Sequence, residues 1–356
     1  MAATTDLLAL TADLVNRPSV SFAEAPFVDW LEDELGALAH LETIRVGDNL
    51  VARTNLGRKQ RLLLVGHTDT VPVNNNGEAR IDQDRLWGVG SCDMKSGLAV
   101  FIELARSVPN PIHDLTFIFY AREEVAQEHN GLGELLEVRP ELLAGDCAVL
   151  GEPTSAGIEA GCQGAMRLEV VLRGARAHTA RPWMGRNAIH RLADLLAALA
   201  SYEARTPTID GCTYKESVQA VSVEGGVAGN VVPDEVTLRI HYRFAPDRTA
   251  DEAESFMRSL LAPHLEDGDR CEVVDLSLAC PPSLDHVLLK ELIDVNGLPV
   301  AAKLGWTDVA RFASIGVPAA NFGPGDPTIA HTQGEYVDRD SIDTVYKALY
   351  ALIAGV

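Results

Sequence analysis

Three short, almost unbroken apolar stretches constrain the fold of this chain more than any other feature. They read RLLLVGH (61–67), DLTFIFYA (114–121) and DCAVLGE (146–152). Strands that are apolar on both faces belong inside parallel sheets that helices cover on both sides. A further strand is expected at NLVART (49–54), and amphipathic helices are expected at Leu7–Asn16, Ala25–Leu38 and Ser96–Ser107. This alternation predicts an α/β domain with a central, mostly parallel sheet.

A different pattern begins after Gly164 and ends near Ser283. Its order is β-α-β-β-α-β, over MRLEVVLRG (166–174), Arg186–Ala200, SVQAVSVEGG (217–226), EVTLRIHYRFA (235–245), Thr249–Leu261 and RCEVVDLSL (270–278). That is the order of a ferredoxin-like split βαβ domain. Because 356 residues exceed what one core usually organises, two domains are expected. We assign residues 1–166 and 282–356 to the larger domain and residues 167–281 to an inserted α+β domain.

The charge and the N-terminus exclude several classes of partner. A net charge of -21 repels nucleic-acid phosphates and anionic lipid, so neither is an expected partner. The first helix carries Asp6 and Asp13 and lacks the basic start of a signal peptide. No run reaches the roughly 20 apolar residues that a membrane span needs. Six cysteines without a CxxC pair are expected to be reduced thiols, which favours a cytoplasmic protein.

Acidic residues and histidines stand where the buried strands end. His67 closes the first strand, and Asp69 follows two residues later. Glu123 and Glu124 follow the second strand, and Glu152 ends the third. Because open α/β sheets bind ligands at the carboxyl ends of their strands, we expect these side chains to share one site.

Two further candidates lie in glycine-rich loops, Asp93 in WGVGSCDMKSG and His331 in FGPGDPTIAHTQGEYV. Each candidate has an ordinary structural alternative when it is taken alone. Asp93 could cap the following helix, with Lys95 as a solvated charge. His331 could be a surface histidine, His67 a hydrogen-bonded structural one, and the paired glutamates a solvated loop.

The spacing of the candidates predicts how they point. Residues i and i+2 of an extended chain share a side, so Asp69 is expected to accept the ring N–H of His67, as carboxylates do for metal-bound histidines. Adjacent strand residues point to opposite faces, so one of Glu123 and Glu124 is expected to bind metal while the other faces substrate. Two histidines and several carboxylates suit two divalent cations, with Zn²⁺ as the first choice.

The chain resembles the M20 family of co-catalytic zinc metallopeptidases and amidohydrolases over nearly its full length. The matching motifs are GHTDTVP, WGVGSCDMKSG, REE, GEPT and AHTQGEYV. Within the family it is most similar to the succinyl-diaminopimelate desuccinylases of the actinobacterial type, through GEPTSAGIEAGCQGAMRLEV, AHTARPWMGRNAIH and KLGWTDVARF. The resemblance implies a zinc-peptidase-like catalytic domain and an inserted ferredoxin-like lid and dimerisation domain.

The resemblance also implies a ligand set for two Zn²⁺ ions, for which Co²⁺ can substitute. Asp93 would bridge the two ions. His67 and Glu152 would complete one of them, and Glu124 and His331 the other. In the family, the peptide bond that follows the bridging acid is cis.

The roles of the remaining site residues follow from the same resemblance. Glu123 matches the general base, and Asp69 matches the residue that orients His67. His178, in RGARAHTARP, matches a histidine that reaches the active site of the partner subunit and donates to the developing oxyanion. A homodimer is therefore implied.

Substrate contacts are implied for Asn230, Arg243 and Thr307. The match is incomplete, because many desuccinylases carry a GRRGS-like segment where this chain reads GCQGA. An arginine anchor for the acyl group is missing there, and Arg167 or Arg181 is a candidate replacement.

The implied reaction hydrolyses N-succinyl-LL-2,6-diaminopimelate, a small N-acyl amino acid, to succinate and LL-2,6-diaminopimelate in lysine and cell-wall precursor biosynthesis. Acetylornithine deacetylase and carboxypeptidase-like activities are alternatives within the family, and a non-catalytic binding protein on the same fold is an alternative of another class. A serine or cysteine nucleophile is the third alternative. The chain has no GxSxG elbow, and Cys92, beside Asp93, is the candidate reactive thiol.

Overall fold

The computed structural model describes residues 5–356, which form two compact units. Unit 1 comprises the chain up to Ala160 together with Ser283–Ala301 and Arg311–Val356. Unit 2 comprises Gly161–Pro282 and the short segment Ala302–Ala310. This short segment, which contains the LGWTD motif, was expected in the larger domain but groups with the inserted one.

Unit 1 is built around an eight-stranded sheet in the order β1-β2-β6-β3-β7-β16-β8-β15. The strands are β1 (Glu42–Val46), β2 (Asn49–Arg53), β3 (Arg61–His67), β6 (Asp114–Tyr120), β7 (Cys147–Leu150), β8 (Ile158–Ala160), β15 (Val300–Ala302) and β16 (Ala319–Asn321). The central strands β6, β3, β7 and β16 pair in parallel, and β2 and β8 pair antiparallel to their inner neighbours. Strands β6 and β7 are buried throughout, and so is β3 after its first residue. The predicted α/β fold with a mostly parallel centre is confirmed.

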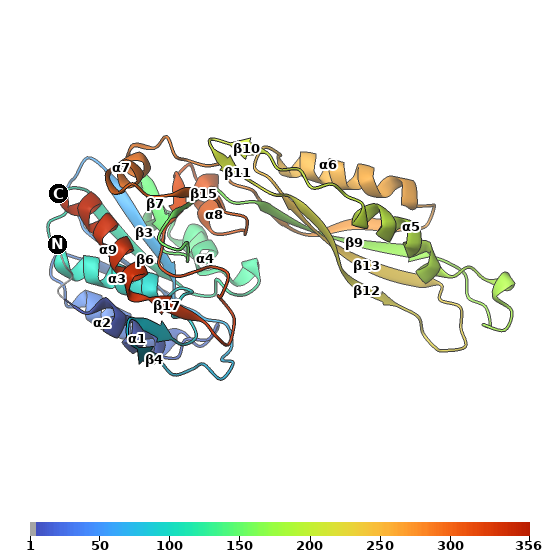
Figure 1. The fold of residues 1–356 in the computed structure, drawn as a ribbon, viewed down its shortest axis with the longest axis horizontal. Helices are drawn as coiled ribbons and strands as arrows, with labels where there is room; N and C mark the ends of the chain where they lie inside the picture. Colours follow the sequence, from blue (N-terminus) through green and yellow to red (C-terminus); the bar gives the residue numbers. More distant parts are fainter. Residues whose placement is uncertain (1–4) are drawn as a thin grey trace. The chain divides into compact units, whose positions relative to one another are not determined.

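The helices of unit 1 are α1 (Leu7–Val15), α2 (Ala25–Gly36), α3 (Lys95–Ser107), α4 (Gly131–Val138), α7 (Val287–Asn296) and α9 (Arg339–Ala354), together with most of α8 (Val309–Ser314), whose first two residues belong to unit 2. Asp6 caps α1 through the Leu8 and Ala9 N–H groups, and Asn130 caps α4 in the same way. Helices α1, α3 and α9 pack against one another, and α3 also contacts β3 and β6 (Figure 1). Among residues 5–356, no helix is both long and apolar enough to cross a membrane.

Shorter elements complete unit 1. The 3₁₀ turns η1 (Gln127–His129) and η2 (Pro140–Leu143) flank α4. A separate antiparallel sheet is formed by β4 (Arg80–Asp82), β5 (Arg85–Trp87) and β17 (Tyr336–Asp338). This small sheet joins the loop before Asp93 to the segment after His331, so it bears directly on the candidate site.

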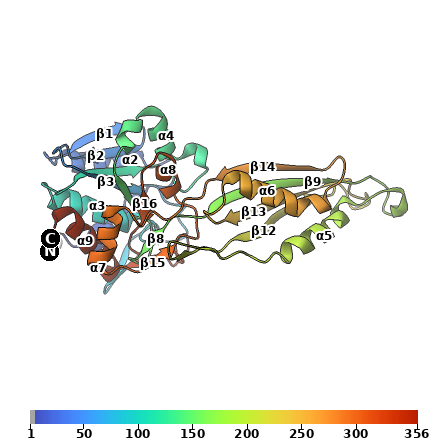
Figure 2. The same ribbon diagram turned by 90° about the horizontal axis from the view of Figure 1, so that it is seen from above.

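Unit 2 is an antiparallel sheet in the order β12-β13-β9-β14, with two helices on one face (Figures 1 and 2). Its main elements are β9 (Gly164–Arg173), α5 (Ala188–Ala200), β12 (Ser217–Gly225), β13 (Glu235–Phe244), α6 (Ala250–Leu261) and β14 (Arg270–Ser277). Smaller elements are η3 (Pro182–Met184), β10 (Thr208–Ile209), β11 (Cys212–Thr213) and η4 (Ala262–His264). The chain order and the strand order are those of a split βαβ unit, as the sequence pattern predicts.

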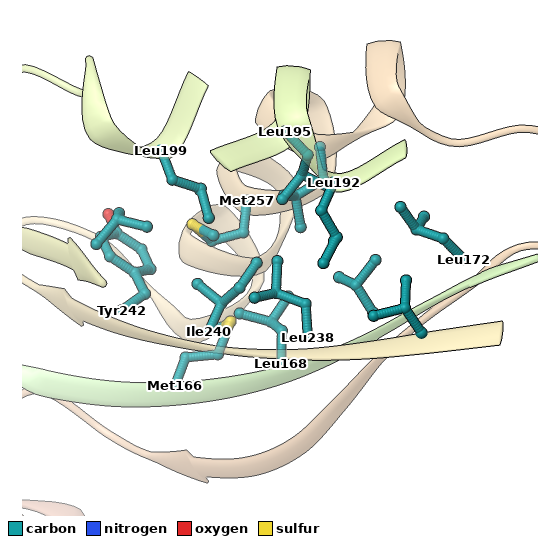
Figure 3. Close-up of a cluster of buried hydrophobic side chains, with 14 of the residues drawn as sticks. Met166, Leu168, Leu172, Leu192, Leu195, Leu199, Leu238, Ile240, Tyr242 and Met257 are labelled. Carbon is teal, nitrogen blue, oxygen red and sulfur yellow. The ribbon is translucent and has the colours of Figure 1, made fainter. Parts of the chain in front are cut away.

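The core of unit 2 lies between the sheet and its helices. Leu192 and Leu195 of α5 and Met257 of α6 meet Leu238 and Ile240 of β13 (Figure 3). Alternate residues of β9 and β13 face this core, whereas the residues between them lie on the open face of the sheet. Polar residues of β9 and β13 therefore share that open face.

Candidate metal centre

Three neighbouring parallel strands carry the candidate residues of unit 1 to one edge of the sheet. Strand β3 ends at His67, and Glu152 follows the end of β7 by two residues. Glu123 and Glu124 lie in the turn after β6. Because β6, β3 and β7 are adjacent and parallel, their carboxyl ends lie together, which brings these side chains close.

Asp93 links the two candidate histidines. Its Oδ1 lies 3.0 Å from Nε2 of His67, and its Oδ2 lies 3.3 Å from Nε2 of His331. Nε2 of His331 is also 2.8 Å from Oε1 of Glu124. The peptide bond between Asp93 and Met94 is cis, as the family resemblance implies. Asp93 does not cap α3, because the cap position belongs to Met94.

The ligand atoms cluster in three groups that could hold a metal ion, each with atoms within 4.8 Å of one another. The groups are His67, Asp93 and Glu152; Asp93, Glu124 and His331; and His67, Glu123 and Glu124. The first two contain the same residues as the ligand sets expected from the sequence, and they share Asp93. Nitrogen and carboxylate donors of this kind suit zinc and similar divalent cations.

Electrostatics inside the cluster favour charged side chains despite the burial. Burial lowers the pKa of His67, but hydrogen bonds to Asp69 and Asp93 outweigh it, so the pKa lies well above the usual value. Burial would raise the pKa of Asp93, yet hydrogen bonds to His331 and His67 hold it below its usual range. Hydrogen bonds to Asp93 and Glu124 raise the pKa of His331 to about 10. Before a cation binds, the two imidazoles therefore carry the positive charge of the cluster.

Asp69 connects His67 to the paired glutamates. Nδ1 of His67 lies 3.0 Å from the backbone oxygen of Asp69 and 3.5 Å from its Oδ1. The Asp69 carboxylate also accepts the backbone N–H groups of Glu123 (3.0 Å) and Glu124 (3.1 Å). The backbone carbonyl of Asp69 is thus the nearer partner of the ring, and the carboxylate chiefly holds the turn.

The expectation that Glu123 and Glu124 point to opposite faces of a strand is wrong. Strand β6 ends at Tyr120, and Arg122 adopts a left-handed conformation with φ 62°. The acids therefore lie in a turn, where strand alternation does not apply. Carboxylate oxygens of both residues come within 4.8 Å of a ring nitrogen of His67.

Two buried ionisable residues near Asp93 make contacts that sequence patterns did not reveal. Glu335 accepts the backbone N–H groups of Cys92 (2.9 Å) and Asp93 (3.1 Å). Lys95, a solvated charge in the alternative interpretation of this segment, is instead 1% exposed and donates to the backbone oxygens of Leu14 and Arg17. The AHTQGEYV motif contains Glu335, but only the fold shows that it supports the loop of Asp93.

Cys92 does not have the properties of a nucleophile. It is fully buried, and its Sγ donates to the backbone oxygen of Asp326. Burial and the neighbouring Asp93 carboxylate raise the pKa of its thiol far above the usual value. A reactive cysteine needs an electropositive and accessible setting, which is absent here. The cysteine-nucleophile alternative therefore finds no support.

The residues His178 and Asn230 lie together in unit 2. The loop between β9 and α5 runs beside the loop between β12 and β13, with His178 in an isolated β-bridge to Val231. The backbone N–H of Thr179 donates to the backbone oxygen of Asn230 at 3.0 Å. His178, Asn230 and Arg181 are all exposed.

Arg243 and Thr307 lie elsewhere in unit 2, and each has a buried polar atom that lacks a hydrogen-bond partner among the described residues. These atoms are Nη1 of Arg243 and Oγ1 of Thr307. Burial lowers the pKa of Arg243, and Arg167 on the adjacent strand lowers it further. Arg167 is exposed on the open face of the sheet, 3.4 Å from Asp275.

Comparison with known proteins identifies the family. Residues 63–355 match peptidase family M20/M25/M40. The chain belongs to that family. The succinyl-diaminopimelate desuccinylase of Corynebacterium glutamicum is 42% identical over 346 residues, which are 96% of this chain and 94% of that protein. A Mycobacterium tuberculosis protein provisionally named as the same enzyme, DapE, is 46% identical over 353 residues, 98% of each chain.

A solved structure shows the same fold at low sequence identity. The crystal structure of a tripeptidase from Staphylococcus aureus matches with a TM-score of 0.81 and 21% identity, over 99% of this chain and 98% of that one. The fold is therefore that of M20 peptidases, in agreement with the sequence-based expectation.

Zinc binding is expected to release protons, because the imidazole of His331 is protonated below a pKa of about 10 whereas a metal ligand must be neutral. Calorimetric zinc titrations at about pH 7 in two buffers of different ionisation enthalpy should give different heats, and the affinity should weaken as the pH falls. His331→Ala should release about one proton fewer. His129→Ala, which removes a surface histidine of the same unit, should not change the release. Equal heats in both buffers would contradict this expectation.

Proposed function

We propose that the protein is a metal-dependent amidohydrolase that converts N-succinyl-LL-2,6-diaminopimelate and water to succinate and LL-2,6-diaminopimelate. The observation that carries the proposal is Asp93, shared by two sets of one histidine and one glutamate. Relatives with 42% and 46% identity over nearly the whole chain carry the name of this activity. The site supplies what amide hydrolysis needs, and the relatives indicate the substrate.

The donor set fits two divalent cations, with zinc as the first choice. Asp93, His67 and Glu152 would hold one ion, and Asp93, Glu124 and His331 the other. Such ions supply an acidified water and polarise the scissile carbonyl. The carboxylates of the cluster outnumber its two imidazoles, so bound cations would also relieve repulsion between like charges.

Glu123 is the general base of the proposed reaction. Its carboxylate belongs to the cluster, within 4.8 Å of His67 and Glu124. A carboxylate placed there accepts the proton of the attacking water as the new C–O bond forms. It then returns the proton to the amide nitrogen as the C–N bond breaks, so that the amine leaves neutral. Asp69 is a positioning residue, because it holds the Glu123 backbone and the ring of His67.

The length of the β9–β13 ladder supports a site built from two chains. His178 and Asn230 lie in loops beyond one end of the ladder, which is the pair Arg173–Glu235. Arg243 pairs with Ala165 near the other end. Eight residue steps separate these pairs, which is about 26 Å at the rise of a strand. One small substrate cannot contact both ends within a chain. We therefore assign His178 and Asn230 to the active site of a partner subunit.

Strand β12 offers a surface for that partner. It is an edge of the four-stranded sheet, and most of its residues are exposed, including Val221 and Val223. A long exposed edge strand with apolar side chains is a template for pairing with a second strand. A second copy of this chain in a homodimer would cover it.

Arg243 and Thr307 are the proposed contacts for a substrate carboxylate. Their unpartnered buried atoms lie in unit 2, where the Sγ of Cys162 contacts the backbone oxygen of Thr307 and also lies near Arg243. A guanidinium and a hydroxyl left without partners are suited to a ligand that brings acceptors. The succinyl substrate carries several carboxylates, whereas an acetyl substrate has none in its acyl group.

A substrate panel tests the proposed activity. With added zinc, kcat/KM for N-succinyl-LL-2,6-diaminopimelate should exceed that for acetylornithine and simple dipeptides by about 100-fold or more, because the site leaves buried polar groups unpaired without the carboxylates. Removal of zinc with a chelator should abolish the activity, and added zinc should restore it. Faster turnover of acetylornithine or dipeptides would instead assign another activity of the family. A protein that binds no divalent metal would favour the non-catalytic alternative.

Glu123→Gln should abolish turnover without loss of metal. The amide cannot accept a proton, so kcat should fall by about 100-fold or more. Metal analysis should still find two zinc ions for each chain, as in the wild type. Glu128→Gln, a nearby exposed acid outside the cluster, should retain wild-type kcat. Loss of zinc from the Glu123 variant would show that this residue is a ligand instead.

Mixed dimers test whether His178 acts on the partner subunit. The variants His178→Ala and Glu123→Gln should each be nearly inactive alone. After subunit exchange in equal amounts, half of the dimers combine one chain of each kind, and one of their two sites contains both intact residues. The mixture should therefore recover about a quarter of the wild-type rate. If His178 acts within its own chain, mixing recovers nothing.

A further inference from the structure

The segment between α1 and α2 touches the turn that carries Glu123 and Glu124, and no role described so far uses it. Ser21 and Glu24 lie in this segment, more than 95 residues before the turn along the sequence. The turn has an unusual backbone, because Arg122 has φ 62° and non-glycine residues seldom adopt positive φ. Contacts from outside the turn must hold it in this conformation.

Ser21 supports the turn through Asp69. Its Oγ donates to Oδ2 of Asp69 at 2.8 Å. The backbone N–H of Glu124 donates to the same oxygen, and that of Glu123 donates to Oδ1. The backbone N–H of Ser21 also donates to the carbonyl of Thr70, which fixes the serine beside its acceptor. The hydroxyl of Ser21 thus sets the orientation of a carboxylate that serves both glutamates.

Glu24 supports the turn directly. Its side chain has no exposed surface, and its Oε1 accepts the backbone N–H of Arg122 at 3.2 Å. The side chain of Arg122 is tied separately, by Nε to the backbone oxygen of His129 and by Nη2 to Glu134. Glu24 therefore satisfies the backbone N–H of Arg122, the residue with positive φ just before the two acids.

We propose that Ser21 and Glu24 are positioning residues of the hydrolytic site, which hold the turn of Glu123 and Glu124 in the geometry that binds metal and substrate. The inference rests on the proposed function for the reaction, but its contacts are independent of the substrate. Neither side chain belongs to the clustered ligand groups. Both act through other residues: Ser21 through Asp69, and Glu24 through the backbone of Arg122.

Ser21 and Glu24 differ in which of the two candidate metal sites they support. Oδ1 of Asp69 also lies 3.5 Å from Nδ1 of His67, so a carboxylate that reorients after the loss of the Ser21 hydroxyl should disturb both candidate metal sites. Glu24 reaches the turn through the backbone N–H of Arg122, next to Glu123 and Glu124, so the loss of Glu24 should disturb chiefly the site of Glu124. This difference gives the proposal a signature that a general loss of stability does not produce.

The decisive experiment titrates zinc into the full chain and measures steady-state kinetics on the same samples. For Glu24→Ala, the affinity of one of the two zinc ions should fall by about 10-fold or more while the other is unchanged, as for residues that orient a ligand. Its kcat should fall by about 10- to 100-fold, with little change in KM. Glu24→Gln keeps an oxygen that accepts the Arg122 N–H, so it should retain most of the activity and both affinities.

Ser21 provides a second and milder test in case Glu24→Ala does not fold. Ser21→Ala should weaken both zinc ions and lower kcat by about 10-fold, whereas Ser21→Thr should restore both values because it keeps the hydroxyl. Ser107→Ala is the matched control. Like Ser21→Ala, it removes a partly buried serine hydroxyl of unit 1. The Ser107 hydroxyl donates to the backbone oxygen of Glu103, at the end of α3 far from the site. It should leave zinc affinity and kcat unchanged.

The outcomes separate this inference from the proposed function. If the wild-type protein hydrolyses no substrate of the panel, the proposed function fails, and the zinc titrations still decide the positioning role. If Glu24→Ala and Ser21→Ala bind both ions as tightly as the wild type, the positioning role is overturned. It is also overturned if Glu24→Gln is as impaired as Glu24→Ala, because charge and not the accepted N–H would then be what matters.

Discussion

The contact of one aspartate with two histidines is the interaction on which the site depends. Asp93 meets His67 on one oxygen and His331 on the other, although the histidines are 264 positions apart (331 − 67). A parallel sheet makes this convergence possible, because its strands all deliver their carboxyl ends to one edge. The site contains more carboxylates than imidazoles, and the repulsion between these like charges is unfavourable. Bound cations would relieve that repulsion.

Two further carboxylates hold the loops around that contact in place. Asp69 accepts two backbone N–H groups from the turn after β6, and Glu335 accepts two from the loop of Asp93. In each case a side chain from one segment holds the backbone of another, so the ligands of the second segment need no strand or helix to place them. Burial raises the pKa of Glu335 to about 7, which shows how far this acceptor is removed from solvent.

The parts that could be predicted from the sequence are those with local patterns. Apolar runs and alternation predicted β2, β3, β6 and β7 of unit 1 and the four long strands of unit 2, and the position of acids at strand ends indicated a shared site. Failures arose where a contact across the chain decided the outcome. The alternative interpretation of the Asp93 segment placed Lys95 in solvent, but Lys95 donates to backbone oxygens at the end of α1. The paired glutamates were expected on a strand, whereas the bend at Arg122 places them in a turn. Ser21 and Glu24 gave no signal at all, since an ordinary serine and glutamate acquire their importance only from distant partners.

The length of the inserted unit is a functional constraint under the proposed mechanism. The ladder between β9 and β13 keeps the pair His178 and Asn230 well apart from Arg243 in the same chain. Shortening the ladder would remove inward residues that pack on α5 and α6, and it would therefore cost stability. Under the proposed mechanism, it would also bring His178 and Asn230 closer to Arg243 along the ladder. Under the proposed mechanism, the strand length would couple two subunits to one reaction, and pairing at the β12 edge would also complete the site.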